Sequence, residues 1–104
     1  MPDARIQAAR NVAVVNKEGL HTRPVMQFVD LASTFKAAVT VTNVTRGGDT
    51  VDGKSAMQMM LLEATMGCVL RIQAAGSDAT EAVEALAALV GRGFDPAGKS
   101  DPGS

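Results

Sequence analysis

His21 is the residue of this chain best suited to chemistry. It is the only histidine among 104 residues, and it stands in the run Gly-Leu-His-Thr-Arg-Pro at positions 19–24. Arg23 adds a planar cation two residues away, able to place two hydrogen bonds on phosphate oxygens. The pair could therefore accept and hold a phosphoryl group, although a surface histidine beside a solvated arginine is the plainer alternative.

The position of His21 along the chain favours the chemical interpretation. Apolar side chains recur with helical spacing at Val25, Phe28, Val29, Ala32 and Phe35, which predicts a helix over about 22–35. His21 would then lie at the start of that helix, where unpaired backbone N–H groups and the positive end of the macrodipole bind phosphate.

Two neighbours of His21 fit such a junction. Pro24, in the first turn, lacks an N–H group that would be unpaired there in any case. Gly19 permits unusual dihedrals and a close approach of the backbone just before the site, and its simpler role is to turn the chain.

The run around His21 closely resembles the phosphorylation site of HPr, the phosphocarrier family of the bacterial phosphoenolpyruvate-dependent sugar phosphotransferase system. A second run, Lys-Ser-Ala-Met-Gln-Met-Met at 54–60, is similar to the family's regulatory serine with its hydrophobic flank. Together with the order of the predicted elements, the resemblance covers about residues 10–92. Ala56 departs from the pattern, since the family usually has a larger apolar residue there.

The resemblance implies a role for each matching residue. His21 corresponds to the phosphorylated histidine, which accepts at Nδ1, and Arg23 to the assisting arginine, while Gly19, Thr22 and Pro24 support them. Ser55 corresponds to the serine that HPr kinase/phosphorylase modifies in many bacteria, although a plain helix N-cap is an equally open interpretation. The implied partners are enzyme I as phosphoryl donor and enzyme IIA as acceptor, with no cofactor and no metal.

An exposed apolar patch beside the histidine would suit such partners. Val25, Met57 and Met60 are the candidates, and flexible methionines adapt to several partners. Methionine at helical spacing is also common in cores, which is the alternative for Met57 and Met60. Lys17 and Glu18 occupy the approach loop, so partner contacts can differ from those of other members.

The elements that must position these residues form a recognisable order. We expect strands at 11–15, 37–44, 50–52 and 68–74, a helix at 22–35, a short helix from Ser55 that loosens before Gly67, and a last helix that Ser77 or Asp78 caps in a capping box with Glu81. The fold class is therefore α+β, an open-faced β-sandwich of order β-α-β-β-α-β-α, with a four-stranded antiparallel sheet covered on one face by helices.

Length and composition set the remaining expectations. A chain of 104 residues suits one domain, at about 10–94, between flexible tails at 1–9 and 95–104. A formal net charge of −1 provides no overall excess of basic residues for binding nucleic acid, and no apolar stretch is long enough for membrane insertion. Cys68 is a lone cysteine, expected in the core, which excludes an intrachain disulfide and favours the cytoplasm. We expect a monomer.

Three functions remain distinguishable at this point. The first is a carrier in sugar uptake, which is phosphorylated at His21 by enzyme I and passes the phosphoryl group to enzyme IIA. The second is a regulatory phosphoprotein of nitrogen or carbon control without a role in sugar transport. The third is an interaction module of the same fold with a coincidental histidine, and failure to accept phosphate from any enzyme I would favour it.

Overall fold

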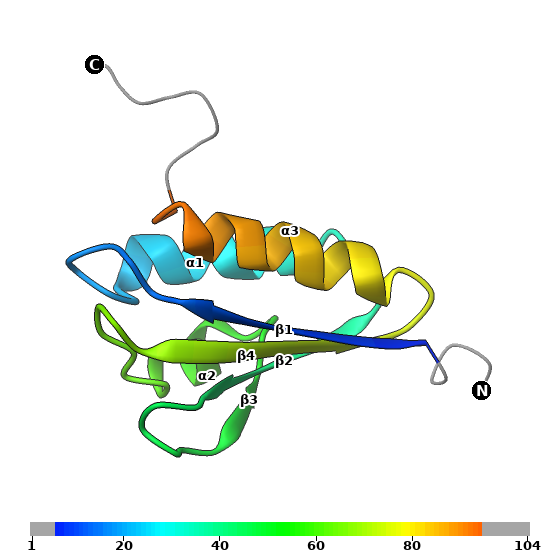
Figure 1. The fold of residues 1–104 in the computed structure, drawn as a ribbon. Coiled ribbons are helices and arrows are strands. Elements are labelled where there is room, and N and C mark those ends of the chain that lie inside the picture. Colours follow the sequence, from blue (N-terminus) through cyan, green and yellow to red (C-terminus); the bar gives the residue numbers. More distant parts are fainter. Residues whose placement is uncertain (1–5, 95–104) are drawn as a thin grey trace.

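The computed structural model describes residues 6–94 of the chain. Its elements follow the expected order, and Figure 1 shows α1 and α3 lying across one side of the sheet. The elements are β1 (Gln7–Ala13), α1 (Thr22–Ala32), β2 (Ala38–Asn43), β3 (Thr50–Asp52), α2 (Ala56–Met60), β4 (Val69–Ala75) and α3 (Ala79–Gly91). Within the described range, none of these helices has the length and apolar character required to span a bilayer.

The four strands form one antiparallel sheet in the order β1-β4-β2-β3. The centre of the sheet pairs Val41 of β2 with both Ile72 of β4 and Val51 of β3. This arrangement confirms the α+β open-faced sandwich predicted from the sequence.

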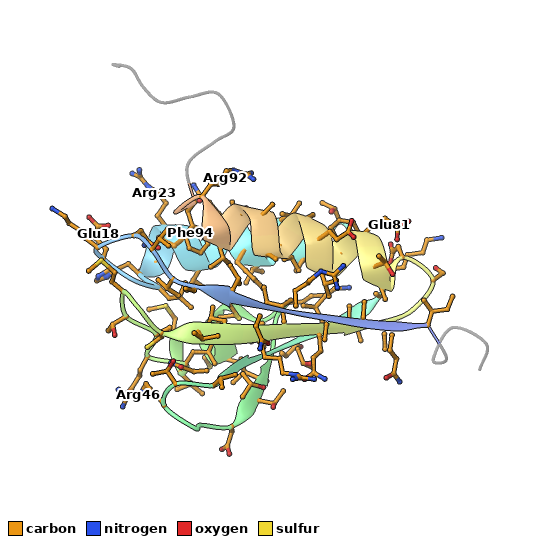
Figure 2. All side chains as sticks on the ribbon, in the orientation of Figure 1. Glu18, Arg23, Arg46, Glu81, Arg92 and Phe94 are labelled. Atoms are coloured by element: carbon orange, nitrogen blue, oxygen red, sulfur yellow. The ribbon has the colours of Figure 1, made fainter. Side chains whose placement is uncertain are left out.

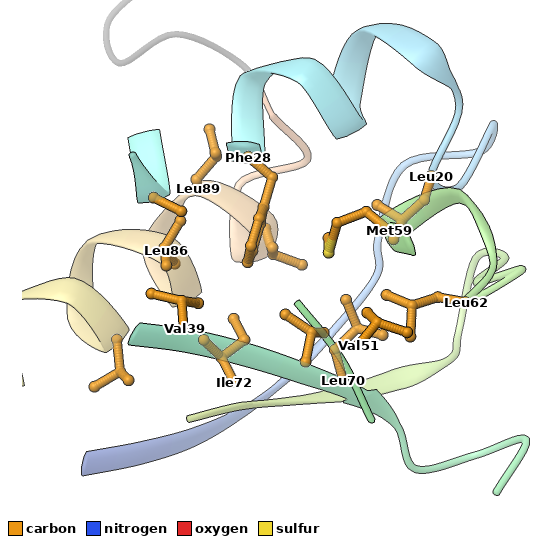
Figure 3. Close-up of a cluster of buried hydrophobic side chains, with 14 of the residues drawn as sticks. Leu20, Phe28, Val39, Val51, Met59, Leu62, Leu70, Ile72, Leu86 and Leu89 are labelled. Carbon is orange, nitrogen blue, oxygen red and sulfur yellow. The ribbon is translucent and has the colours of Figure 1, made fainter. Parts of the chain in front are cut away.

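The inner face of the sheet carries the core. Val39 and Val41 alternate with the more exposed Thr40 and Thr42 along β2, as the period of two in the sequence predicts. Figure 3 shows Phe28 of α1 directed toward this face, within a buried cluster drawn from all three helices and the sheet. The buried members labelled there are Leu20, Phe28, Val39, Val51, Met59, Leu62, Leu70, Ile72, Leu86 and Leu89.

Several element boundaries differ from the sequence prediction. β1 begins at Gln7 and ends at Ala13, so residues 7–9 belong to the sheet and not to an N-terminal tail. Their small or polar side chains carry no strong strand pattern, and only pairing with β4 makes them a strand. Helix α1 ends at Ala32 and α2 at Met60, each earlier than expected. The expected tail at 95–104 lies outside the described residues.

The capping box predicted for the last helix does not form. Asp78 is the N-cap residue of α3, but its side chain makes no capping hydrogen bond. The carboxylate instead accepts hydrogen bonds from the backbone N–H of Lys36, at 2.9 Å, and of Ala37, at 2.8 Å. The bond from Lys36, together with that from Ala37, lowers the pKa of Asp78. Asp78 therefore ties the start of α3 to the chain that enters β2.

Candidate functional site

His21 is the N-cap residue of α1, with φ −86° and ψ −175°. Its side chain is exposed and makes no capping hydrogen bond, and among residues 6–94 no other partner holds the imidazole. Its carbonyl accepts the first hydrogen bond of the helix, from the N–H of Val25 at 3.0 Å. The backbone is therefore fixed by the helix, while both ring nitrogens stay open to an incoming group.

The first turn of α1 presents donors beside this imidazole. Thr22 and Arg23 begin the helix, and no acceptor in the described chain lies opposite their backbone N–H groups. Pro24 follows as the third helical residue and has no N–H to satisfy. Two free N–H groups at the positive end of an eleven-residue helix make a site that favours an anion.

Arg23 adds a full positive charge at the same place. Its side chain is exposed and forms neither of the two ion pairs found in the described chain, which join Arg10 to Glu84 and Arg46 to Glu63. Figure 2 shows Arg23 and Glu18 at the same end of the molecule, projecting from the surface. The guanidinium therefore remains available to an anionic group in this region.

The loop that carries His21 rests on a distant segment of the chain. Gly19 has φ +69°, and a Cβ atom at this position would come within 2.5 Å of the Ala64 carbonyl oxygen and 2.9 Å of the Thr65 Cα. The N–H of Leu20 donates to the same Ala64 carbonyl at 3.0 Å, and the Leu20 side chain enters the core. Close approach to Ala64 and Thr65 thus explains Gly19, and no sequence signal pointed to those two residues.

Ser55 lies on a different element from His21. It is the N-cap of α2, and its Oγ accepts a hydrogen bond from the backbone N–H of Gln58 at 3.2 Å, which confirms the capping role. Ala56 is half-buried and packs against the core. Helix α2 contacts α1, and the chain that leaves it supplies Ala64 beneath the His21 loop. The two candidate residues therefore belong to neighbouring, mutually packed elements.

The expected docking residues divide into two groups. Met57 and Met60 are 79% and 45% exposed, so they lie on the surface and not in the core. Val25 is only 1% exposed, and its assignment to the patch is wrong. The reason is its place on the same stripe of α1 as Phe28, which faces the sheet. Further exposed apolar side chains that the sequence analysis did not single out include Val15, Met26, Leu61 and Met66.

Comparison with known proteins identifies the family to which this chain belongs. Residues 8–92 match the family model described as the PTS HPr component phosphorylation site. The chain is 40% identical over 82 residues to phosphocarrier protein HPr of Haemophilus influenzae, covering 79% of this chain and 93% of that one. It is 38% identical over 86 residues to phosphocarrier protein NPr of Proteus mirabilis, covering 83% and 93%.

A solved structure agrees with the sequence matches. The crystal structure of phosphocarrier protein HPr from Bacillus anthracis superposes with a TM-score of 0.75 at 40% identity, covering 81% of this chain and 96% of that one. The fold and the matched segment, which contains His21 and Ser55, therefore indicate the same protein family. The chain belongs to the HPr family of phosphocarrier proteins of the phosphotransferase system.

Proposed function

We propose that this protein takes a phosphoryl group from phosphoenolpyruvate, by way of enzyme I, onto His21 and passes it to an enzyme IIA in sugar uptake. The observation that carries the proposal is the exposed, unpartnered imidazole at the start of α1, next to free N–H groups of Thr22 and Arg23. It acts as a cytoplasmic monomer and needs no cofactor, because enzyme I supplies an activated phosphoryl group.

The chemistry follows from this arrangement. Nδ1 of His21 attacks the phosphorus, so a P–N bond forms as the bond from phosphorus to the donor atom of enzyme I breaks. The group that arrives carries negative charge on its oxygens, and Arg23 with the two backbone N–H groups stabilises that charge. The same attack by an acceptor atom of enzyme IIA on phosphorus returns His21 to its free form.

Partner proteins dock on the exposed apolar side chains around α2. Met57 and Met60 project from the helix itself, and Leu61 and Met66 from the chain that follows it. These side chains bury apolar area on association, and flexible methionine side chains fit more than one partner. One surface can in this way serve both a phosphoryl donor and a phosphoryl acceptor.

Ser55 is the proposed regulatory position. HPr kinase/phosphorylase would transfer a phosphoryl group from ATP to its Oγ, which adds nearly two negative charges next to Met57 and Met60. Such charge opposes the burial of an apolar surface, so phosphorylation at Ser55 lowers acceptance at His21. Ser55 is half-buried as a residue, and its cap bond with Gln58 lies at the exposed start of the helix.

A second candidate function is a regulatory phosphoprotein of nitrogen or carbon control. The observation in its favour is that the relative named NPr matches this chain at 38% identity and the one named HPr at 40%. The two candidates share the acceptor His21 and differ in the protein that removes the phosphoryl group. Transfer from the labelled chain to an isolated enzyme IIA of a sugar permease distinguishes them.

The acceptor itself is tested by the stability of the label. With phosphoenolpyruvate and enzyme I, the label should be lost in mild acid and survive alkali, because the P–N bond of phosphohistidine is acid-labile. With ATP and HPr kinase, label on Ser55 would be an ester that survives acid. The variant His21→Ala should take no label from enzyme I. An acid-stable product in the first reaction, or undiminished labelling of that variant, refutes His21 as the acceptor.

A further inference from the structure

Asn16 is joined to the His21 loop by a small network of hydrogen bonds. Its side-chain Nδ2 donates to the Gly19 carbonyl oxygen at 2.7 Å. The N–H of Gly19 donates back to the Asn16 backbone carbonyl at 3.1 Å. The same Gly19 carbonyl accepts the N–H of His21 at 3.1 Å, so one oxygen receives both the Asn16 side chain and the backbone of the acceptor residue.

The burial of Asn16 fixes the orientation of its amide. The side chain is half-buried, and its Oδ1 is enclosed without a hydrogen-bond partner in the described part of the chain. Rotating the amide by half a turn would set Oδ1 against the Gly19 oxygen and bring two acceptors together. Nδ2 therefore stays on the Gly19 carbonyl, even though this orientation leaves Oδ1 without a donor.

We propose that Asn16 is a positioning residue for phosphoryl transfer, which orients His21 through the Gly19 carbonyl. The proposal rests on the proposed function of His21. Gly19 has a left-handed φ of +69°, and only Leu20 separates it from His21, so rotation of the Gly19 peptide changes the direction in which the chain enters α1. Asn16 holds the carbonyl side of that peptide, while the Leu20 N–H on its other side is held by the Ala64 carbonyl.

The consequence is that the His21 imidazole approaches the phosphorus atom from one fixed direction. The imidazole leaves the backbone at the N-cap, directly before the free N–H groups of Thr22 and Arg23. Transfer requires the ring nitrogen and these donors to face the same phosphoryl group at once. Loss of the Asn16 bond leaves the Gly19 peptide held by backbone bonds alone and lets its carbonyl tilt. Misplacement of reacting groups by about 1 Å can cost about 100-fold in rate. Asn16 is not one of the exposed apolar side chains proposed for docking, so docking should persist.

The test uses two variants of the full chain with purified enzyme I and phosphoenolpyruvate. Asn16→Asp keeps the shape but, when ionised, has no donor, and Asn16→Ala removes the group without adding charge. We expect both to lower kcat for acceptance by about tenfold with KM nearly unchanged. In NMR spectra of the unphosphorylated protein, the His21 amide should exchange with solvent faster than in wild type, while amides of the central strands do not change.

Gln27→Leu is the matched control. Gln27 also carries a half-buried amide whose oxygen lacks a partner among residues 6–94, but no hydrogen bond joins it to the His21 loop. Its kcat should stay at the wild-type value. Equal kcat in wild type and both Asn16 variants, an effect on KM alone, or the same loss in Gln27→Leu would each overturn the positioning role. Absence of label on the wild-type chain would instead refute the proposed function itself.

Discussion

Gly19→Ala should destabilise the protein far more than the same change at Gly47. Both glycines adopt nearly the same left-handed conformation, with φ +69° and φ +71°. An added Cβ at Gly19 meets the backbone of Ala64 and Thr65, at 2.5 Å and 2.9 Å, whereas at Gly47 it meets nothing within 4 Å. The pair therefore separates the cost of the dihedral angle from the cost of the close approach.

The expected magnitudes follow from these contacts. For alanine the left-handed conformation costs about 1–2 kcal/mol, and the less flexible unfolded chain offsets about 0.4–1 kcal/mol, which leaves about 1 kcal/mol for Gly47→Ala. At Gly19 the backbone of Ala64 must also move, which adds about 1–3 kcal/mol and weakens the bond from the Leu20 N–H. We therefore expect the free energy of unfolding to fall by about 2–4 kcal/mol in Gly19→Ala.

Urea denaturation followed by circular dichroism measures both changes. The midpoint should fall with an unchanged slope, since the surface exposed on unfolding stays the same. Gly19→Ala should also accept phosphate from enzyme I more slowly, because the His21 loop can no longer rest on Ala64. Equal midpoints for the two variants would refute the argument that close backbone approach is the reason for Gly19.

Three further predictions concern charge. Arg23→Ala should slow transfer to His21 by about 10- to 100-fold through loss of a charge-assisted contact. The control Arg71→Ala, on the open face of the sheet, should leave the rate unchanged. Equal rates of transfer for Arg23→Ala and wild type would make Arg23 a plain surface charge. Ser55→Asp should raise the KM for enzyme I, whereas Ser55→Asn, an uncharged cap, should not. Equal KM values for the two variants would mean that Ser55 is only a cap. The pKa of Asp78 is lowered in the folded protein, so its ionised form stabilises the fold. This stabilisation is fully present above the unfolded pKa of about 3.9 and is lost as pH falls through the lower pKa of the folded state. Asp78→Asn should therefore unfold at lower urea than wild type at pH 7 and approach it in acid, and a constant difference at all pH values would contradict this.

Much of the fold was predictable because its signals are local. The alternation in β2 placed Val39, Val41 and Asn43 on one face, and all three are buried. Asn43 shows the limit of such reasoning: its burial follows from register, but its Nδ2 is satisfied by the carbonyl of Leu62, a partner that periodicity does not identify. Cys68 is likewise buried as predicted, although it precedes β4 instead of lying within it.

Two of the errors, at Asp78 and at residues 7–9, share one physical origin. Asp78 has the residue type and spacing of a capping box with Glu81, yet two N–H groups from the chain after α1 compete successfully for its carboxylate. Residues 7–9 become strand because β4 offers a complementary edge. In each case a long-range hydrogen-bond partner outweighed a weak local preference.

The amino-acid sequence by itself determined the order of the elements and singled out the proposed acceptor site, because His21, Arg23 and the start of α1 are contiguous and their spacing carries the signal. Only the tertiary structure decided what holds that site in place. Ala64 lies more than forty residues beyond Gly19 and reaches it only because α2 packs on α1 and turns the chain back beneath the loop. Sequence periodicity reports which side of an element is buried, whereas the backbone contacts that fix His21 depend on which distant segments the packed core brings together.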